Sequence, residues 1–434
     1  MDLTDQQGEV LQPHSPQPAR RPDGKGCSRR QERERLNGVL WMLMVAISAL
    51  ASGACGRMNG PLNTGIDSKP LYPAYHVAPA GSDTADGSRQ HPWATLQHAA
   101  TVAGPGDTVH VAPGTYLSGE IVFRTSGTPE ARTRFVSDAK WQAKIRHNSS
   151  SHACLTLLAN YIDLIGFDLS SPLAYRGIWN VGNNNGILDN HIHDMPNPDV
   201  GRTGAGIVDD AGEAGYLLHD ALISGNVVHD IGAFGVTPQS GRVHGIYLSF
   251  PSGEVCTNNI VYHNVGWGIH GYHAFSHATI TNNLSFNNGR AGILIAAASP
   301  SDGNPNRVKA DQCVVTNNIC LYNQGGAGIE EGGNGYVGNG NTYANNLVYG
   351  NARGGISTTG GSRAQGTVNA DPGLVDYQAD GTGDYHLVPG SPCIDAGTTL
   401  GAPAADLDGN QRPMGPGNDI GPYEYGASTP SVGW

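Results

Sequence analysis

Positive charge is scarce in this sequence. Lysine occurs five times among 434 residues, all charged residues together make up 14%, and the formal net charge is −12. An acidic protein with so few cations does not attract the phosphates of nucleic acid or an anionic membrane surface. Nucleic acid is therefore excluded as the main partner, and contact with a membrane would need a separate anchor.

Cysteine motifs for metal or redox chemistry are missing too. The seven cysteines include no C-x-x-C pair and no zinc-finger spacing. Five of them lie in apolar strand contexts: Cys154, Cys256, Cys313, Cys320 and Cys393. We expect buried thiols there, with one disulfide between Cys313 and a neighbouring coil as the alternative.

A hydrophobic run long enough to span a bilayer is also lacking near the N-terminus. The run at residues 39–51 has 13 residues, whereas a spanning helix needs about 20. It follows a basic stretch and ends in small residues before Cys55, which is the pattern of a secretory signal. We expect residues 1–55 to be a disordered N-terminus plus signal peptide. The protein would then be exported, as a periplasmic, outer-surface or secreted protein.

Cys55 resembles the acceptor cysteine of a bacterial lipoprotein, although Ser52 stands where that motif prefers Leu. A lipid anchor at Cys55 would be the only membrane attachment. Release without an anchor is the alternative.

Glycine and asparagine are abundant instead, and both recur at regular spacing. Glycine occurs 62 times. An Asn followed by an apolar strand pattern recurs every 24 to 36 residues, at Asn190, Asn226, Asn259, Asn283, Asn318 and Asn346. A Gly-Ile pair recurs every 23 to 39 residues, at Gly177, Gly206, Gly245, Gly268, Gly292, Gly328 and Gly355.

Two interleaved series with one period predict one coil per repeat and at least two strands per coil. The strands of successive coils would stack in parallel, about 4.8 Å apart. We expect the recurrent Asn to take left-handed backbone in a turn and its amide to bond the same Asn one coil on. The exported chain would be a single solenoid of about nine to eleven coils.

Both ends of this region resemble a known superfamily. Residues 76–116, HVAPAGSDTADGSRQHPWATLQHAATVAGPGDTVHVAPGTY, are similar to the opening of secreted right-handed parallel β-helix proteins of the pectate-lyase-like superfamily. Residues 371–425, which contain DPGLVD, SPCIDAG and NDIGPYEY, resemble their closing segment. The resemblance implies an all-β fold: a right-handed parallel β-helix (solenoid) with a short N-terminal capping helix near residues 93–103 and a C-terminal capping segment.

We place the β-helix with its N-terminal cap at residues 72–375 and the C-terminal capping segment at residues 376–434. The same resemblance implies a monomer that acts on an acidic or neutral polysaccharide.

The outward side chains of the Gly-Ile strands point to a functional site. If each Ile faces inward, the residue two places after each Gly faces outward. This column includes Tyr247, His270 and Glu330, and the next outward column includes Asp210, Ser249 and Tyr272. Tyr247 and His270 would be neighbours on adjacent strands. A merely solvated wall would carry Thr, Ser, Asn and Lys there.

We assign roles by side-chain chemistry. His270 and Tyr247 are the candidate base and acid, and the other catalytic candidates are His244, Arg242, Tyr272 and His273. Ser249, Trp267 and Glu330 are candidate substrate contacts, and Asp209 and Asp210 are candidate ligands for Ca²⁺. Each has a structural alternative, since tyrosines form aromatic ladders and histidines and aspartates stabilise turns.

Three enzyme classes and one binding class remain open. β-Elimination needs a base and a cation to meet the uronate carboxylate, and related β-helix lyases use Ca²⁺ with a Lys or Arg base, or a His/Tyr pair. Lys309 is the only lysine after Lys144, so we favour a polysaccharide lyase that uses His270 and Tyr247, with Arg242 or bound Ca²⁺ as the cation. The alternatives are a glycoside hydrolase that pairs Asp209 or Asp210 with Glu330, a non-catalytic glycan-binding protein, and an epimerase.

Overall fold

The computed structural model describes eight stretches of the chain: residues 74–196, 204–210, 218–235, 242–249, 251–273, 275–298, 309–332 and 336–426. Residues 1–55 lie outside them, so the secretory signal and the lipid anchor at Cys55 stay predictions. Among the helices of these stretches, none has the length and apolar character needed to cross a bilayer.

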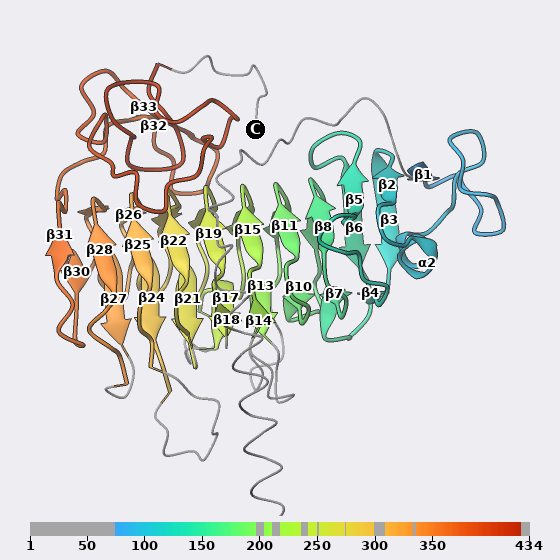
Figure 1. Cartoon of the computed structure of the whole chain (residues 1–434), viewed down its shortest axis with the longest axis horizontal. Coiled ribbons are helices and arrows are strands. Elements are labelled where there is room, and N and C mark those ends of the chain that lie inside the picture. The colour runs from blue at the N-terminus through green and yellow to red at the C-terminus, as the bar shows by residue number, and fades with distance from the viewer. Residues whose placement is uncertain are drawn as a thin grey trace, which may run out of the picture. The chain divides into compact units, whose positions relative to one another are not determined.

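The described chain winds through three parallel sheets, and most coils add one strand to each (Figure 1). Sheet A has 11 strands. In stack order they are β1 (Ala74–Val77), β2 (Thr108–Val111), β5 (Thr133–Ser137), β8 (Ile162–Ile165), β11 (Gly186–Leu188), β15 (Leu222–Ser224), β19 (Val255–Thr257), β22 (Thr279–Thr281), β25 (Val314–Thr316), β28 (Thr342–Ala344) and β31 (Ala364–Gln365).

Sheets B and C have nine strands each. Sheet B consists of β3 (Gly114–Ser118), β6 (Ala143–His147), β9 (Asp168–Ser170), β12 (His191–His193), β16 (Val227–His229), β20 (Ile260–Tyr262), β23 (Leu284–Phe286), β26 (Ile319–Leu321) and β29 (Leu347–Tyr349). Sheet C consists of β4 (Ile121–Phe123), β7 (Ala153–Leu157), β10 (Arg176–Asn180), β13 (Gly204–Asp210), β17 (Val243–Ser249), β21 (Ile269–Tyr272), β24 (Ile293–Ala296), β27 (Ile329–Gly332) and β30 (Ile356–Ser357). The predicted all-β parallel β-helix is confirmed.

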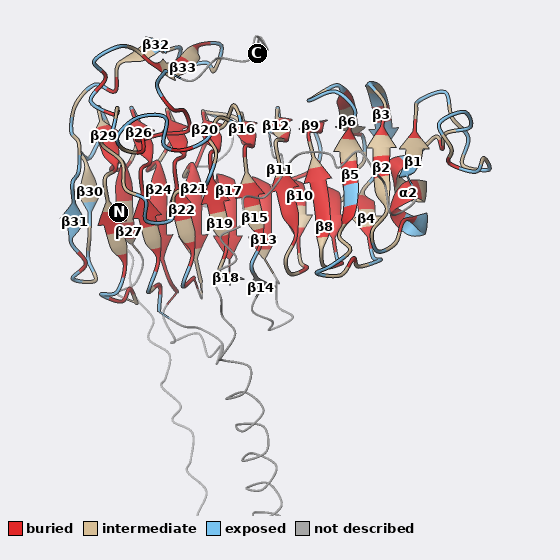
Figure 2. Cartoon of the chain, turned by 45° about the horizontal axis from the view of Figure 1, so that its top comes forward, coloured by how far each residue is buried: buried red, intermediate tan, exposed pale blue. Residues whose placement is uncertain are grey.

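The Gly-Ile series forms the inner edge of sheet C. The isoleucines of the six full coils, Ile178, Ile207, Ile246, Ile269, Ile293 and Ile329, are all 0% exposed. Each preceding glycine lies where inward side chains of sheet B come close: a Cβ on Gly206 would be 2.3 Å from Cγ1 of Val228, and one on Gly245 would be 2.4 Å from Cγ1 of Val261. Glycine recurs because a larger residue would collide with the core. Figure 2 shows this buried interior along the stack.

The predicted Asn ladder is confirmed. The side-chain amide of Asn226 donates to Oδ1 of Asn259 at 3.0 Å, and Asn259 repeats the contact to Asn283 at 3.0 Å. Each Oδ1 also accepts the backbone N–H of the Asn one coil before it. The ladder therefore satisfies polar groups that the solenoid interior shields from water.

The left-handed backbone lies one residue earlier than expected. Asn258, Asn282, Asn317 and Asn345, each immediately before a ladder Asn, have φ between 53° and 55°. The ladder Asn has left the turn and begins the next strand, so its side chain can point along the stack. A second ladder, absent from the sequence analysis, joins Asn264, Asn288, Asn323 and Asn351 at the corner between sheets B and C.

The N-terminal helix is α2 (Leu96–Val102), shorter than the predicted residues 93–103. Thr95 caps it, since its hydroxyl accepts the N–H of His98 at 3.1 Å. Leu96, Ala99 and Ala100 are buried in the same core as the first strands, and Figure 1 shows the helix at that end of the stack.

The C-terminal segment lies along the side of the solenoid. It contains the antiparallel pair β32 (Leu374–Asp376) and β33 (Asp384–Leu387). Its apolar residues Tyr385, Leu387, Ile420 and Tyr423 pack with outward residues of sheet B such as Tyr262, Phe286, Ile319 and Leu347. We expected a cap over the open end, and these contacts instead attach the segment to the flank.

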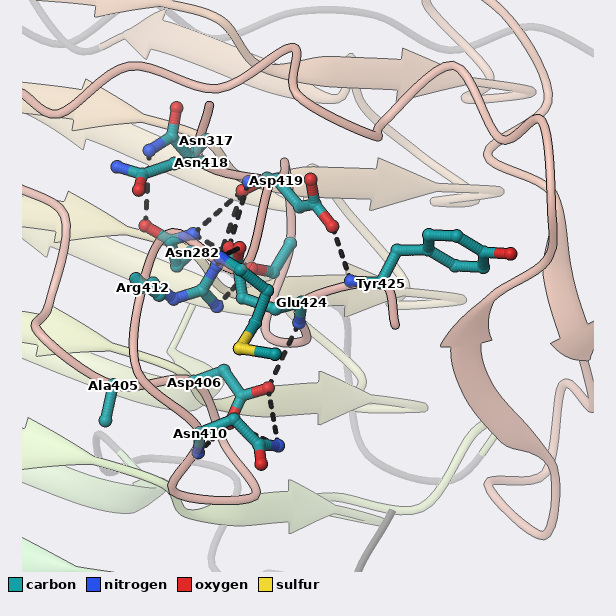
Figure 3. A network of polar contacts seen from close by, with 12 residues as sticks. Asn282, Asn317, Ala405, Asp406, Asn410, Arg412, Asn418, Asp419, Glu424 and Tyr425 are labelled. Atoms are coloured by element: carbon teal, nitrogen blue, oxygen red, sulfur yellow. Dashed lines mark hydrogen bonds and ion pairs between the residues drawn. The ribbon is translucent and has the colours of Figure 1, made fainter. Parts of the chain in front are cut away.

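A polar network fixes this attachment (Figure 3). The buried guanidinium of Arg412 contacts the carboxylate of Glu424 and donates to the carbonyl of Gly421 at 2.9 Å. From the solenoid, the amide of Asn282 donates to the same Gly421 carbonyl at 2.9 Å, and that of Asn258 donates to the carbonyl of Ala405 at 3.0 Å. The left-handed Asn residues thus also hold the segment in place.

The remaining strands are the short pair β14 (Leu218–His219) and β18 (Pro251–Ser252). The five cysteines after Cys55 are all buried free thiols. The expected buried thiols are confirmed, and the disulfide at Cys313 is not formed.

Candidate functional site

The register predicted for the outer face of sheet C is correct. Tyr247 on β17 pairs with His270 on β21, and Ser249 pairs with Tyr272. Asp210 on β13 pairs with Ser249, one strand away. The strand alignment from the glycines therefore brought together the right neighbours.

Strict alternation of side chains breaks at the glycine, and this adds His244 to the same face. A Cβ on Gly245 would point at the core residue Val261, and the next residue, Ile246, is also in the core. Two consecutive residues thus face inward, which leaves His244 before them and Tyr247 after them on the outer side. A sequence alignment that assumes strict alternation of side chains therefore could not place His244 on the outer side.

Three rings surround His270: those of His244, Trp267 and Tyr247. Nε2 of His244 lies 3.0 Å from Nδ1 of His270, so these nitrogens share a hydrogen bond. The Trp267 ring stacks on His270 with centroids 4.5 Å apart, and the Tyr247 ring centroid is 5.1 Å away. The remaining nitrogens, Nδ1 of His244 and Nε2 of His270, are buried without a hydrogen-bond partner. The hydrogen-bonding capacity of these two nitrogens is therefore unused among the described residues.

Both imidazoles are neutral at ordinary pH. Burial, together with the Arg290 guanidinium, lowers the pKa of His244 to about 3. Burial lowers the pKa of His270 well below its usual value, with further contributions from His244, His273 and Arg290. When Nδ1 of His270 donates to Nε2 of His244, Nε2 of His270 keeps a free lone pair that can accept a proton, so this tautomer suits a general base.

His270 and Tyr247 face outward as expected, but neither is open to solvent. Each is only 5% exposed, and Ser249 is 0% exposed with its hydroxyl buried and unpartnered. Tyr247 packs against Ala205 and Val208, with Trp179 and Tyr272 beside them. Large outward rings on consecutive coils cover one another, because strands at the parallel spacing leave less room than the rings occupy.

Arg290 is the cation that the sequence analysis missed. Its guanidinium lies over the Trp267 ring, 4.6 Å from the centroid, and it lowers the pKa of both His244 and His270. It precedes Gly292 by two residues. Aligning the residues before each Gly-Ile pair, rather than only those after it, would have found it.

Of the other candidates, Tyr272 and His273 border the ring cluster. The Tyr272 ring centroid is 5.4 Å from that of His270 and 4.7 Å from that of His273. Arg242 is exposed immediately before β17, and its carbonyl accepts the N–H of Gly204. The described contacts therefore support Arg290 rather than Arg242 as the cation beside His270.

Glu330 does not join the cluster. It is separated from His270 by Leu294, two strands along sheet C. Its carboxylate accepts the N–H of Ala327 at 2.8 Å. That contact fits a turn-capping role.

Asp209 and Asp210 do not form one chelating pair. They are successive residues of β13, so their side chains leave opposite faces of the sheet. Asp209 is 0% exposed and accepts from the amide of Asn180 at 2.7 Å. Asp210 stands on the side of Ser249.

The inward carboxylate of Asp209 belongs to a buried acidic pair. Burial raises the pKa of Asp209 and also that of Glu254, whose two oxygens are buried without partners. The Asp209 carboxylate further raises the pKa of Glu254, because like charges repel in a poorly solvated interior. Both groups therefore hold their protons to higher pH than exposed carboxyls do.

Comparisons with known proteins agree with the architecture. The family model described as Pel9A-like, right handed beta helix region, matches residues 75–370. The crystal structure of pectate lyase Pel9A superposes with a TM-score of 0.59 at 16% identity, over 81% of this chain and 96% of that one. A rhamnogalacturonan lyase superposes with a TM-score of 0.50 at 16% identity, over 72% of this chain and 92% of that one.

No curated protein matches the sequence. At 16% identity the structural similarities show the fold, which is the predicted right-handed parallel β-helix.

Proposed function

Since the chain belongs to the Pel9A-like right-handed β-helix family, we propose that it is a polysaccharide lyase that cleaves a uronic-acid-containing glycan by β-elimination on the outer face of sheet C. The observation that carries the proposal is the neutral His244–His270 pair beside Tyr247 and Arg290. The pectate lyase and rhamnogalacturonan lyase that share the fold make this class of substrate a natural choice.

The reaction assigns a step to each group. Nε2 of His270 takes the proton from the ring carbon next to the carboxylate, while the Arg290 guanidinium stabilises the negative charge that develops on that carboxylate. The electron pair forms a carbon–carbon double bond as the bond to the glycosidic oxygen breaks. The Tyr247 hydroxyl gives its proton to that oxygen. His244 orients His270 through their shared hydrogen bond, and Trp267 offers its ring to the sugar.

The negative substrate itself would help the base. Burial and the neighbouring positive charge lower the pKa of His270 in the free protein. A carboxylate bound beside Arg290 offsets that charge, which raises the basicity of His270 when substrate is present.

The carboxylates of the glycoside hydrolase alternative lie too far apart. Strands β13 and β27 are four steps apart in sheet C, about 19 Å at the parallel-strand spacing. Two catalytic carboxylates of a glycosidase stand about 5 to 9.5 Å apart. Asp209 or Asp210 with Glu330 therefore does not make such a site.

The proposal is tested with uronan substrates, such as pectate and rhamnogalacturonan, by following the ultraviolet absorbance of unsaturated products. We expect His270→Gln and Tyr247→Phe each to lower turnover about 10²–10⁴-fold, with unchanged circular dichroism. Glutamine is preferred to alanine at position 270 because the imidazole is buried and its loss would leave a cavity. Glu330→Gln is the matched control and should retain activity.

Two results would contradict this assignment. A loss of activity in Glu330→Gln with an active His270→Gln variant would move the chemistry to the carboxylates. Binding of the glycan with neither unsaturated products nor new reducing ends would make the protein a non-catalytic binder.

A requirement for Ca²⁺ is a separate proposal. Ca²⁺ takes six to eight oxygen ligands, so Asp210 would contribute one carboxylate and the substrate and water the rest. We expect EDTA to remove activity and added CaCl₂ to restore it, with a larger CaCl₂ requirement in Asp210→Asn. Full activity in EDTA would show that Arg290 suffices.

Export through residues 1–55 likewise remains proposed.

A further inference from the structure

A cluster of histidines lies on the outer face of sheet B, away from the site on sheet C. His191 and His193 are on β12 and His229 is on the next strand, β16. One ring nitrogen from each lies within 4.8 Å of the others. The side chains are 22%, 13% and 13% exposed, so a small ion can reach them.

Carboxylates fix the rings from outside the cluster. Nδ1 of His191 donates to Asp168 on β9 at 2.9 Å, and Nδ1 of His229 donates to Asp230. His193 contacts Asp194 through Nδ1 at 2.9 Å and Asp168 through Nε2 at 3.2 Å. Arg146 is the cation that balances Asp168. A carboxylate behind each imidazole is the arrangement that orients metal-binding histidines.

These hydrogen bonds determine where the lone pairs point. A carboxylate only accepts, so Nδ1 of both His191 and His229 carries a proton. A ring with no second proton has a lone pair at Nε2. The two Nε2 atoms lie 2.8 Å apart. Two lone pairs facing each other at that distance repel, and only a proton or a metal ion between them removes the repulsion.

We propose that His191, His193 and His229 bind a divalent transition-metal ion. Imidazole ligands favour Zn²⁺, Cu²⁺ or Ni²⁺ over Ca²⁺ and Mg²⁺. Two nitrogens about 2.05 Å from a tetrahedral Zn²⁺ stand about 3.3 Å apart, so the two Nε2 atoms need to separate by only about half an ångström. His193 supplies the third nitrogen after breaking its contact with either Asp168 or Asp194. The contact with the remaining aspartate then keeps the His193 ring in place.

The ion would fasten successive coils of sheet B. Its ligands come from β12 and β16, and Asp168 on β9 extends the connection to a third strand. Beside the cluster, Asp194 and Asp230 line a pocket of about 350 Å³ with Phe234 and His263. Three protein ligands leave a coordination position that a water molecule can occupy.

The test is titration of the full chain, prepared without a polyhistidine tag and treated with EDTA, with ZnCl₂ in a calorimeter. We expect one Zn²⁺ per chain at micromolar or tighter affinity and a higher melting temperature. His229→Gln and His191→Gln should each weaken binding more than 100-fold. Asp230→Asn, which keeps all three ligands, should weaken it about 10–100-fold. His91→Gln, an exposed histidine in the N-terminal region, is the matched control and should bind as wild type.

Cobalt gives a readout that does not depend on variants. Co²⁺ bound by the wild-type chain should show the visible absorption of a four-coordinate nitrogen site, and Zn²⁺ should abolish it. Absence of stoichiometric Zn²⁺ binding would overturn the proposal and leave a shared proton between His191 and His229. Equal affinity in wild type and in a folded His229→Gln variant would overturn it too. Neither result depends on lyase activity.

Discussion

The surroundings of His270 make its basicity sensitive to a single side chain. Burial, His244, His273 and Arg290 all lower its pKa. Arg290 is also the proposed binding partner of the substrate carboxylate. One substitution at Arg290 should therefore affect both the proton equilibrium and substrate binding.

We predict that Arg290→Gln raises KM for a uronan by about tenfold or more, which is the loss expected for a charge-assisted hydrogen bond. With the cation removed, the pKa of His270 rises. The acid limb of the kcat/KM profile then moves to higher pH, because the base becomes protonated at a higher pH. Arg290→Lys, which keeps a charge, should leave that limb in place. A profile unchanged in Arg290→Gln would show that the guanidinium does not act on His270.

At the scale of structural elements, the Asn ladder gives a sharp contrast between buried and exposed asparagines. Asn259 is 0% exposed, its amide donates to Ile223 and Asn283, and its Oδ1 accepts from Asn226. Alanine in its place leaves several of these partners buried and unsatisfied, at about 1–3 kcal/mol for each group. Asn339 is exposed, so its replacement should not incur this free-energy cost.

We predict that Asn259→Ala lowers the free energy of unfolding by about 2–5 kcal/mol, while Asn339→Ala changes it by less than about 0.5 kcal/mol. Urea unfolding of both variants measures the difference. Because each coil contacts mainly its neighbours, hydrogen exchange should accelerate first around β19 and β20. Similar losses in the two variants would contradict a structural role for the ladder.

At the scale of the whole molecule, a histidine couples the docked C-terminal segment to pH. His386 lies between Asp384 and Asp408, 2.6 Å and 2.8 Å from their carboxylates, and its ring centroid is 4.0 Å from that of the buried Tyr423. Burial opposes its protonation, but these two carboxylates raise the pKa of His386 above its usual value. Its ion pairs therefore stabilise the docked segment fully below pH about 6.5, the ordinary pKa of histidine, and the contribution is lost as pH rises through the raised pKa.

We predict that amide exchange in β33 is slower at pH 5.5 than at pH 8.5, after correction for intrinsic rates. His386→Gln should remove this difference, with its main loss of protection on the acidic side. His91→Gln should leave it unchanged. Equal protection in wild type at both pH values would mean that the ion pairs of His386 do not stabilise the segment.

The architecture was predictable from the sequence because it rests on local repetition. Each Gly-Ile pair must pass close to sheet B, and each ladder Asn must meet its equivalent one coil on, so the same residues recur once per coil. That periodicity also aligned Tyr247 with His270 and Ser249 with Tyr272. The solenoid and the core of its candidate site followed from these patterns alone.

Only the tertiary structure decided how the side chains use that framework. The break in alternation at Gly245, which brings His244 to Nδ1 of His270, depends on inward side chains of another sheet. Arg290 reaches the site from the next coil, and the C-terminal segment docks along the flank. His191 and His229 are 38 residues apart in the sequence, but their side chains are in contact. Burial of His270 results from the combined bulk of rings on neighbouring strands. These features depend on contacts between coils, which a one-dimensional period does not encode.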